Sequence, residues 1–194
     1  MMKFSKIWSI IGTLFIVALI SSTLLTLVYN ITEEPIKEAQ NRIISDGIKE
    51  VIVTEFDNDP FAEKIVVRRG KERYTLYPAR NKGYVTSIVM KSLSNNGFGG
   101  RIDIIVGFLL DGRISGYKVI SHKETPGLGS KIDEKGFKER IIGMSPNTSS
   151  FNVRQDGGEI DAITGATISS RALIDAIKRA YRGYKKFNTG NSDE

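Results

Sequence analysis

Asp161-Ala162-Ile163-Thr164-Gly165-Ala166-Thr167-Ile168-Ser169-Ser170 is the stretch around which the fold of this chain is organised. It places a glycine and several hydroxyl side chains in a turn that leads directly into an apolar periodic pattern. The apolar residues that recur after it at spacings of three and four are Leu173, Ile177, Ala180, Tyr181 and Tyr184. Such spacing predicts one buried face of a helix. Either Ser169 or Ser170 can cap that helix by accepting a hydrogen bond from a free N–H of its first turn.

The start of this helix also has chemistry of its own. The first N–H groups of a helix have no partner within it, and the helix dipole is positive at that end. A phosphate group can therefore bind there, small residues let the backbone approach it, and Thr167 adds a hydroxyl. The alternative is an ordinary helix cap rich in serine and threonine, because short motifs of this kind are often accidental.

The composition excludes several classes of site. The chain has 194 residues, which suits one domain plus an N-terminal segment. It has no cysteine, so disulfides, zinc–thiolate sites and cysteine-ligated iron–sulfur clusters are excluded. His122 is the single histidine, which disfavours a histidine metal site or a Ser-His-Asp triad. We therefore expect no metal site and no catalytic residue acting alone.

The N-terminus predicts a membrane anchor. No charged residue occurs between Lys6 and Glu33, and about 20 apolar residues are enough to span a bilayer core. Trp8 and Tyr29 stand near the two ends of the run, where amphipathic aromatic residues prefer the membrane interface. We expect a cytoplasmic tail at residues 1–6 and a transmembrane helix at residues 7–31. A cleaved signal peptide is the rival interpretation, but the run is longer than usual and no A-x-A site follows.

The distribution of charge indicates the orientation and disfavours one class of partner. Lys3 and Lys6 precede the span without any acidic residue, which places the tail inside and the domain on the extracytoplasmic side of the inner membrane. The net charge of +6, less these two lysines, leaves +4 for the rest of the chain. A nucleic-acid-binding protein needs a concentrated basic patch. We expect membrane lipid as a partner and no nucleic acid.

The remaining pattern predicts an α+β domain. A helix is expected from Glu33 to Glu50, with Pro35 near its start, as a stalk or first helix at residues 32–50. The strand-like runs are Lys64–Arg68, Arg73–Tyr77, Tyr84–Met90, Ile102–Leu110, Ile114–Ser121 and Ser150–Arg154, with connections at Arg69–Lys71 and Ala79–Gly83. Asp111-Gly112 predicts a hairpin, which we expect at the centre of an antiparallel sheet. A short helix is expected around Phe137, Ile141 and Ile142. The domain is expected to end at residue 187, before a polar tail at 188–194.

A second motif follows the hairpin directly: His122-Lys123-Glu124-Thr125-Pro126-Gly127-Leu128-Gly129-Ser130-Lys131. Its proline and glycines predict a loop whose backbone can lie against a flat ligand. Glu124, Thr125 and Lys131 could bind ring carbonyls, a ring N–H or a phosphate. The alternative is a plain Pro-Gly turn with exposed charges, and His122 is more often a strand-end histidine than a proton donor.

These two motifs together resemble the FMN-binding domain whose flavin is attached covalently. The resemblance rests on His122-x-Glu-Thr-Pro-Gly-Leu-Gly129 and Asp161-x-x-Thr-Gly-Ala-Thr-x-Ser169, supported by Gly97-Phe98-Gly99-Gly100 before the hairpin. This domain occurs in the G subunit of the Rnf electron-transport complex and in the C subunit of the sodium-translocating NADH:quinone reductase. Thr164 stands where many members have serine, which keeps the hydroxyl. The compact size is more similar to the Rnf protein.

The resemblance implies a cofactor and a set of site residues. A dedicated flavin transferase would link the phosphate of FMN to Thr167 as a phosphoester, with Asp161 to Ala166 as its recognition context. The segment Glu124 to Gly129 would line the isoalloxazine ring. The full set of cofactor-binding residues is then Glu124, Thr125, Pro126, Gly127, Leu128, Gly129, Lys131, Thr164, Gly165, Ala166, Thr167 and Ser169.

The implied function is electron transfer. The chain would be a membrane-anchored flavoprotein subunit of an Rnf-type ion-translocating ferredoxin:NAD⁺ oxidoreductase, beside other membrane subunits of the complex. One alternative keeps the flavin but places it in a related complex, such as a quinone reductase or an extracytoplasmic reductase. Another is an anchored binding module without a cofactor, which would bind anionic polymers or lipids in a salt-sensitive manner.

Overall fold

The computed structural model describes residues 4–69, 72–148 and 150–190. The chain divides into two compact units, residues 1–42 and residues 43–194. Helix α1 runs from Phe4 to Val51, and the side chains from Trp8 to Thr32 are exposed. It is long and apolar enough to cross a membrane, judged by its length and composition. Residues 33–50 are helical as expected, but they continue α1 without a break, and Pro35 lies inside the helix. Proline removes one helical hydrogen bond, but its φ is compatible with helix.

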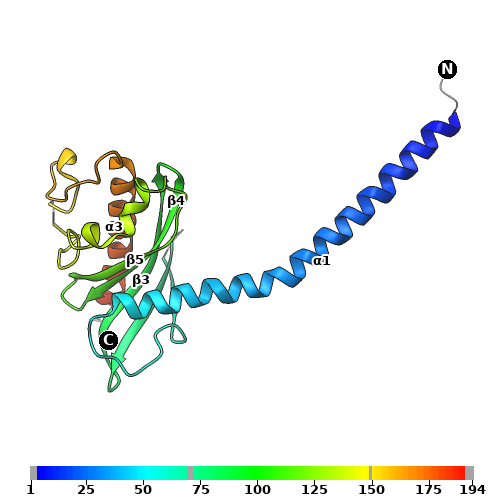
Figure 1. Cartoon of the computed structure of the whole chain (residues 1–194). Helices are drawn as coiled ribbons and strands as arrows, with labels where there is room; N and C mark the ends of the chain where they lie inside the picture. Colours follow the sequence, from blue (N-terminus) through cyan, green and yellow to red (C-terminus); the bar gives the residue numbers. More distant parts are fainter. Residues whose placement is uncertain (1–3, 70–71, 149, 191–194) are drawn as a thin grey trace. The chain divides into compact units, whose positions relative to one another are not determined.

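The second unit contains a five-stranded antiparallel sheet (Figure 1). Its strands are β1 (Ile65–Arg69), β2 (Glu72–Asn81), β3 (Tyr84–Gly97), β4 (Gly100–Leu109) and β5 (Ile114–Ser121). Each strand pairs with the next along the chain, so the spatial order is β1-β2-β3-β4-β5. The α+β class with an antiparallel sheet is therefore confirmed. The Asp-Gly hairpin joins β4 to β5 at one edge, and its expected central position was wrong because the long strand β3 occupies the centre.

Several expected boundaries also differ from the structure. Strand β2 continues through Ala79 to Asn81, and a tight turn with positive φ at Lys82 (50°) and Gly83 (82°) replaces the expected loop. These angles suit the turns that join twisted hairpin strands. The strand expected at Ser150–Arg154 is absent from the described residues there. That segment forms one isolated bridge, Val153 to Ile160, and a 3-10 turn. The connection expected at Arg69–Lys71 lies partly outside the described residues.

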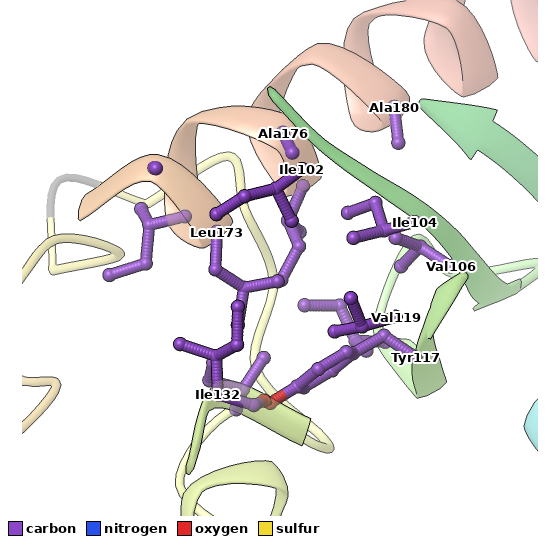
Figure 2. Packing of buried hydrophobic residues seen from close by; sticks show 14 of the residues in the cluster. Ile102, Ile104, Val106, Tyr117, Val119, Ile132, Leu173, Ala176 and Ala180 are labelled. Carbon is purple, nitrogen blue, oxygen red and sulfur yellow. The ribbon is translucent and has the colours of Figure 1, made fainter. Parts of the chain in front are cut away.

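Helix α3 (Thr167–Gly190) covers one face of the sheet and forms the main core. Figure 2 shows side chains of β4 and β5 facing the small residues Ala176 and Ala180 of this helix. The small side chains let the helix pack closely against the strands. Below them, the hydroxyl of Tyr117 donates a hydrogen bond of 2.5 Å to the carbonyl of Ile132. Residues 188–190 of the expected polar tail extend α3, and residues 191–194 lie outside the described part.

The opposite face of the sheet is covered by the C-terminal end of α1. Ile44, Ile48 and Val51 are buried there in a second apolar cluster with side chains of β2, β3 and β4. Ser115 of β5 donates a hydrogen bond of 2.7 Å to the carbonyl of Val51. Gly116 makes this approach possible, because a Cβ there would lie 3.2 Å from the Cα of Val51. The last turn of α1 is therefore an integral part of the sheet domain.

A charged cluster beside this contact joins α1 to the segment that follows β5. That segment contains a 3-10 turn, η1 (Gly129–Asp133), and the short helix α2 (Lys135–Lys138), close to the helix expected there. Glu50 lies 3.0 Å from Lys118 of β5 and 3.2 Å from Lys138 of α2. Burial raises the pKa of Glu50, but the hydrogen bonds from the two lysines outweigh it and lower that pKa overall.

Candidate functional site

Three segments far apart in the sequence enclose one cavity of about 510 Å³. They are the turn between β3 and β4, the loop after β5, and the start of α3. The residues that line the cavity are Phe98, Glu124, Thr125, Leu128, Gly129, Gly165, Ala166, Thr167, Ile168 and Ser169. A volume of this size is in the range of small-molecule and cofactor sites. The two motifs identified in the sequence therefore meet in space.

The chain enters α3 through a turn at Gly165, whose φ of 77° lies in the left-handed region that favours glycine. The helix begins two residues later, at Thr167, so the expectation that Ser169 or Ser170 precedes it as the cap was wrong. Ser170 lies in the first turn instead. Its hydroxyl accepts a hydrogen bond of 3.0 Å from the N–H of Ile163 and donates one of 3.0 Å to the carbonyl of Ala166. These bonds hold the turn against the helix.

The first backbone donors of α3 are available at the cavity. The N–H of Ser170 is bound to the carbonyl of Ala166, whereas those of Thr167, Ile168 and Ser169 have no hydrogen-bond partner among the described residues. Unpaired N–H groups and the positive end of the helix dipole together favour an anion. Thr167 is half-buried and lines the cavity at this point. A phosphate joined to its side chain would lie beside these donors.

Glu124 ties the three segments together from inside the cavity wall. Its side chain is 5% exposed. One carboxylate oxygen accepts a hydrogen bond of 3.0 Å from the N–H of Gly99 in the β3–β4 turn. The other accepts a short hydrogen bond from the hydroxyl of Ser169 in α3. Both oxygens of Glu124 therefore accept hydrogen bonds, as the oxygens of an ionised carboxylate do.

Glycines make room for this buried carboxylate. A Cβ at Gly129 would lie 2.6 Å from the Oγ of Ser169 and 2.7 Å from the Oε2 of Glu124. A Cβ at Gly97 would overlap the other oxygen of Glu124. The glycines therefore shape the cavity wall around Glu124, in addition to giving a ligand access to the backbone.

Replacing Glu124 by alanine is expected to lower the free energy of unfolding by about 2–4 kcal/mol, because the buried hydroxyl of Ser169 and the partly buried N–H of Gly99 lose their acceptor. Glu124→Gln is expected to cost less, since an amide can accept from Gly99 and donate to Ser169. Pulse proteolysis in urea measures both values. The matched control is Glu159→Ala, at an exposed glutamate, with an expected change within about 0.5 kcal/mol. An alanine at 124 that costs no more than this control would contradict the bracing role.

Some of the expected site residues do not line the cavity. Pro126 and Gly127 are exposed, and they shape the loop without reaching its wall. Lys131 and Thr164 lie in a neighbouring polar hollow of about 520 Å³. His122 accepts a hydrogen bond of 3.1 Å from the N–H of Glu124 through Nδ1. This is the routine structural role expected for a histidine at the end of a strand.

Two cavity residues were not assigned a site role from the sequence. Phe98 is 70% exposed and Ile168 is 48% exposed, and both line the cavity. An aromatic residue within a Gly-x-Gly-Gly turn is a signal that could have identified Phe98, because such a turn cannot bury a large ring in its own core. Leu128, 45% exposed, completes an apolar rim.

The residues present fit a flat aromatic ring joined to a phosphate. The apolar rim of Phe98, Leu128 and Ile168 offers contact surface for a ring. The start of α3 offers N–H donors for a phosphate. Among the described residues, no group of acidic, histidine or cysteine side chains is arranged to hold a metal ion.

Comparison with solved structures shows the same fold. The C subunit of the Na⁺-translocating NADH-quinone reductase from Parabacteroides distasonis superposes with a TM-score of 0.56 at 20% identity, covering 78% of this chain and 95% of that one. NqrC of Shewanella oneidensis gives a TM-score of 0.52 at 20% identity, covering 63% of this chain and 62% of that one. The FMN-binding domain family matches residues 97–182, which include the cavity residues.

Comparison with curated proteins gives relatives that match over most of their length. The G subunit of the ion-translocating oxidoreductase complex of Vibrio cholerae is 32% identical over 178 residues, which cover 86% of this chain and 85% of the relative. The protein of the same name from Pseudoalteromonas atlantica is 34% identical over 181 residues, covering 87% and 83%. Identity at this level over most of both chains shows common family membership. This chain belongs to the family of G subunits of ion-translocating oxidoreductase complexes.

Proposed function

We propose that this chain is the membrane-anchored flavoprotein subunit of an Rnf-type ion-translocating oxidoreductase complex, and that it relays electrons through FMN attached covalently to Thr167. The family supports the role of an electron-transfer subunit that works within a complex. The convergence of the loop Glu124–Gly129 with Thr167 around one cavity supports the position of the cofactor.

The proposed bond is a phosphoester between the hydroxyl of Thr167 and the FMN phosphate. The free N–H groups of the first turn of α3 would stabilise the negative charge of that phosphate. Gly165, Ala166 and Ser169 shape the turn around it. The FMN would supply the electron-carrying chemistry, while the protein positions the ring and controls its surroundings.

The other cavity residues would hold the isoalloxazine ring. Phe98, Leu128 and Ile168 give it an apolar boundary, and Thr125 adds a polar group at the cavity wall. Glu124 fixes the relative positions of the three segments through its bonds to Gly99 and Ser169. We assign Lys131 and Thr164 no direct ring contact, because they line the neighbouring hollow.

The proposed organisation has four parts. A cytoplasmic tail at residues 1–6 precedes the transmembrane helix at 7–31. A stalk at 32–50, whose last turns already pack on the sheet, leads to the FMN-binding domain at 51–187 on the extracytoplasmic side of the inner membrane. The basic residues before the span support this orientation. The partners are other membrane subunits of the complex, the surrounding lipid, and a flavin transferase that attaches the FMN.

The single observation that carries the proposal is the cavity that joins the two motifs at the N-terminus of α3. To test it, the full chain is produced as an exported, anchored protein with and without a flavin transferase, and denaturing gels are scanned for flavin fluorescence. A fluorescent band that depends on the transferase is expected. A band that is dark in both cases, beside a control protein that the same transferase labels, would contradict the proposal.

A further inference from the structure

A second, strongly basic cavity lies where strands β2 and β3 separate. Their pairing runs from Asn81 opposite Tyr84 to Thr75 opposite Lys91. Beyond that point Arg73 pairs with Arg68 of β1, while β3 continues along β4. A cavity of about 390 Å³, which we call the fork pocket, opens between the two strands. Residues of β2, β3, β4 and α3 line it.

The fork pocket gathers cations from all four elements: Arg73, Lys91, Arg101 and Arg179. Its single carboxylate, Asp103, is bound by Arg101 at 2.7 Å and 2.6 Å. The hydrogen bonds to that carboxylate raise the pKa of Arg101, so Arg101 and Asp103 form a neutral pair. The side chains of Arg73, Lys91 and Arg179 have no hydrogen bond or ion pair among the described residues. The lining therefore carries a net charge of about +3.

This concentration of charge is unusual within the chain. The full sequence has a net charge of +6, and subtracting Lys3 and Lys6 leaves +4 for everything after the apolar run. The fork pocket thus holds most of that surplus. Two other polar cavities have balanced charge. In one, Lys131 and Arg140 face Glu134 and Asp161.

The second balanced cavity contains an ion pair between Arg171 and Asp156 at 2.6 Å, next to Asp175 and Lys178. The three cations of the fork pocket that have no carboxylate partner repel each other, and a bound anion relieves that repulsion. Guanidinium groups match the geometry of phosphate oxygens and bind them through two hydrogen bonds at once. The lining of the fork pocket is therefore suited to a phosphoryl group.

We propose that the fork pocket is a binding site for a phosphate-class oxyanion, either the phosphoryl group of an anionic lipid or a soluble phosphate compound. This site is separate from the attachment point of the flavin. Thr167 and Arg179 lie on the same helix, twelve positions apart, which corresponds to about 18 Å along its axis. A phosphate on Thr167 cannot fill the fork pocket, so the inference does not depend on the proposed flavin site.

The test uses the full chain in detergent at low salt, produced without a flavin transferase. Binding of inorganic pyrophosphate is measured by calorimetry, and retention of phosphatidylglycerol or phosphatidylcholine is measured by native mass spectrometry. The variants are Arg179→Gln, Lys91→Gln and the two combined. The matched control is Arg182→Gln, because Arg182 is an exposed cation of the same helix outside the fork pocket.

We expect the double variant to bind at least about tenfold more weakly than the wild type and Arg182→Gln, with affinity that falls as salt rises. Retention of phosphatidylglycerol without pyrophosphate binding identifies a lipid site, and binding of pyrophosphate identifies a site for soluble phosphates. Both results support the proposal. Absence of binding to either probe, or equal binding by the double variant and Arg182→Gln, would overturn it. Melting curves of the variants verify that each remains folded.

Discussion

Replacing Thr167 by alanine is expected to abolish covalently bound flavin while the domain stays folded. The substitution removes the hydroxyl that would form the phosphoester, so no bond to the cofactor can form at this position. Alanine is a strong helix former, and the side chain of Thr167 makes no hydrogen bond that the structure shows. The change in the free energy of unfolding is expected to stay within about 0.5 kcal/mol. In-gel flavin fluorescence and pulse proteolysis measure the two effects separately.

The matched control for this variant is Thr164→Ala in the same turn. Thr164 is exposed and lines the neighbouring hollow instead of the cavity. We expect this variant to remain fluorescent after denaturation. Flavin attachment would be slower if the transferase contacts the turn. Retention of covalent flavin by Thr167→Ala, or its loss only from Thr164→Ala, would move the attachment site away from Thr167.

Replacing Phe108 by alanine is expected to produce the largest loss of stability, about 3–5 kcal/mol. Phe108 of β4 is fully buried, and its ring centroid lies 5.1 Å from that of Tyr184 and 5.7 Å from that of Tyr181 in α3. Truncation removes these contacts and leaves a cavity between the sheet and the helix. A domain of this kind has a total stability of roughly 5–15 kcal/mol, so much of it would be lost.

The control for Phe108 is Phe98, a phenylalanine of the cavity rim. Phe98 is 70% exposed, so Phe98→Ala is expected to change the free energy of unfolding by no more than about 0.5 kcal/mol. Its effect should be seen in the fluorescence of bound flavin instead. Pulse proteolysis in urea suits both variants. Tryptophan fluorescence would not report the unfolding of the sheet domain, because the single tryptophan, Trp8, lies outside it. Equal stability losses in the two variants would contradict the assigned core.

Local sequence patterns predicted the strands and helices better than their arrangement. The bounds of β5 were predicted correctly, because Asp111-Gly112 ends the preceding strand and alternating apolar residues follow it. The position of this hairpin in the sheet was not predictable in the same way, because pairing depends on all five strands. Strand β3 was expected to end at Met90, because Lys91 to Asn96 are mostly polar and carry a weak strand signal. In the structure it extends to Gly97.

For the candidate site as well, local motifs were predictable from the sequence and long-range contacts were not. Both motifs were recognisable because proline, glycine and hydroxyl residues cluster in short stretches. The bracing role of Glu124 was not recognisable, because its two partners, Gly99 and Ser169, lie 25 and 45 residues away in the sequence. The fork pocket was missed for the same reason. Arg73, Lys91 and Arg179 form no cluster along the chain, and only the fold places them around one cavity.

Covalent attachment of FMN to Thr167 is tested by the mass of the denatured full chain after co-production with a flavin transferase, followed by fragmentation of its tryptic peptides. The peptide of residues 155–171 contains both threonines of the turn and the two serines after it. We predict a mass gain of one FMN less one water, located on Thr167 within that peptide. An unmodified mass from a chain exposed to an active transferase, or an FMN located on another residue, would contradict attachment at Thr167.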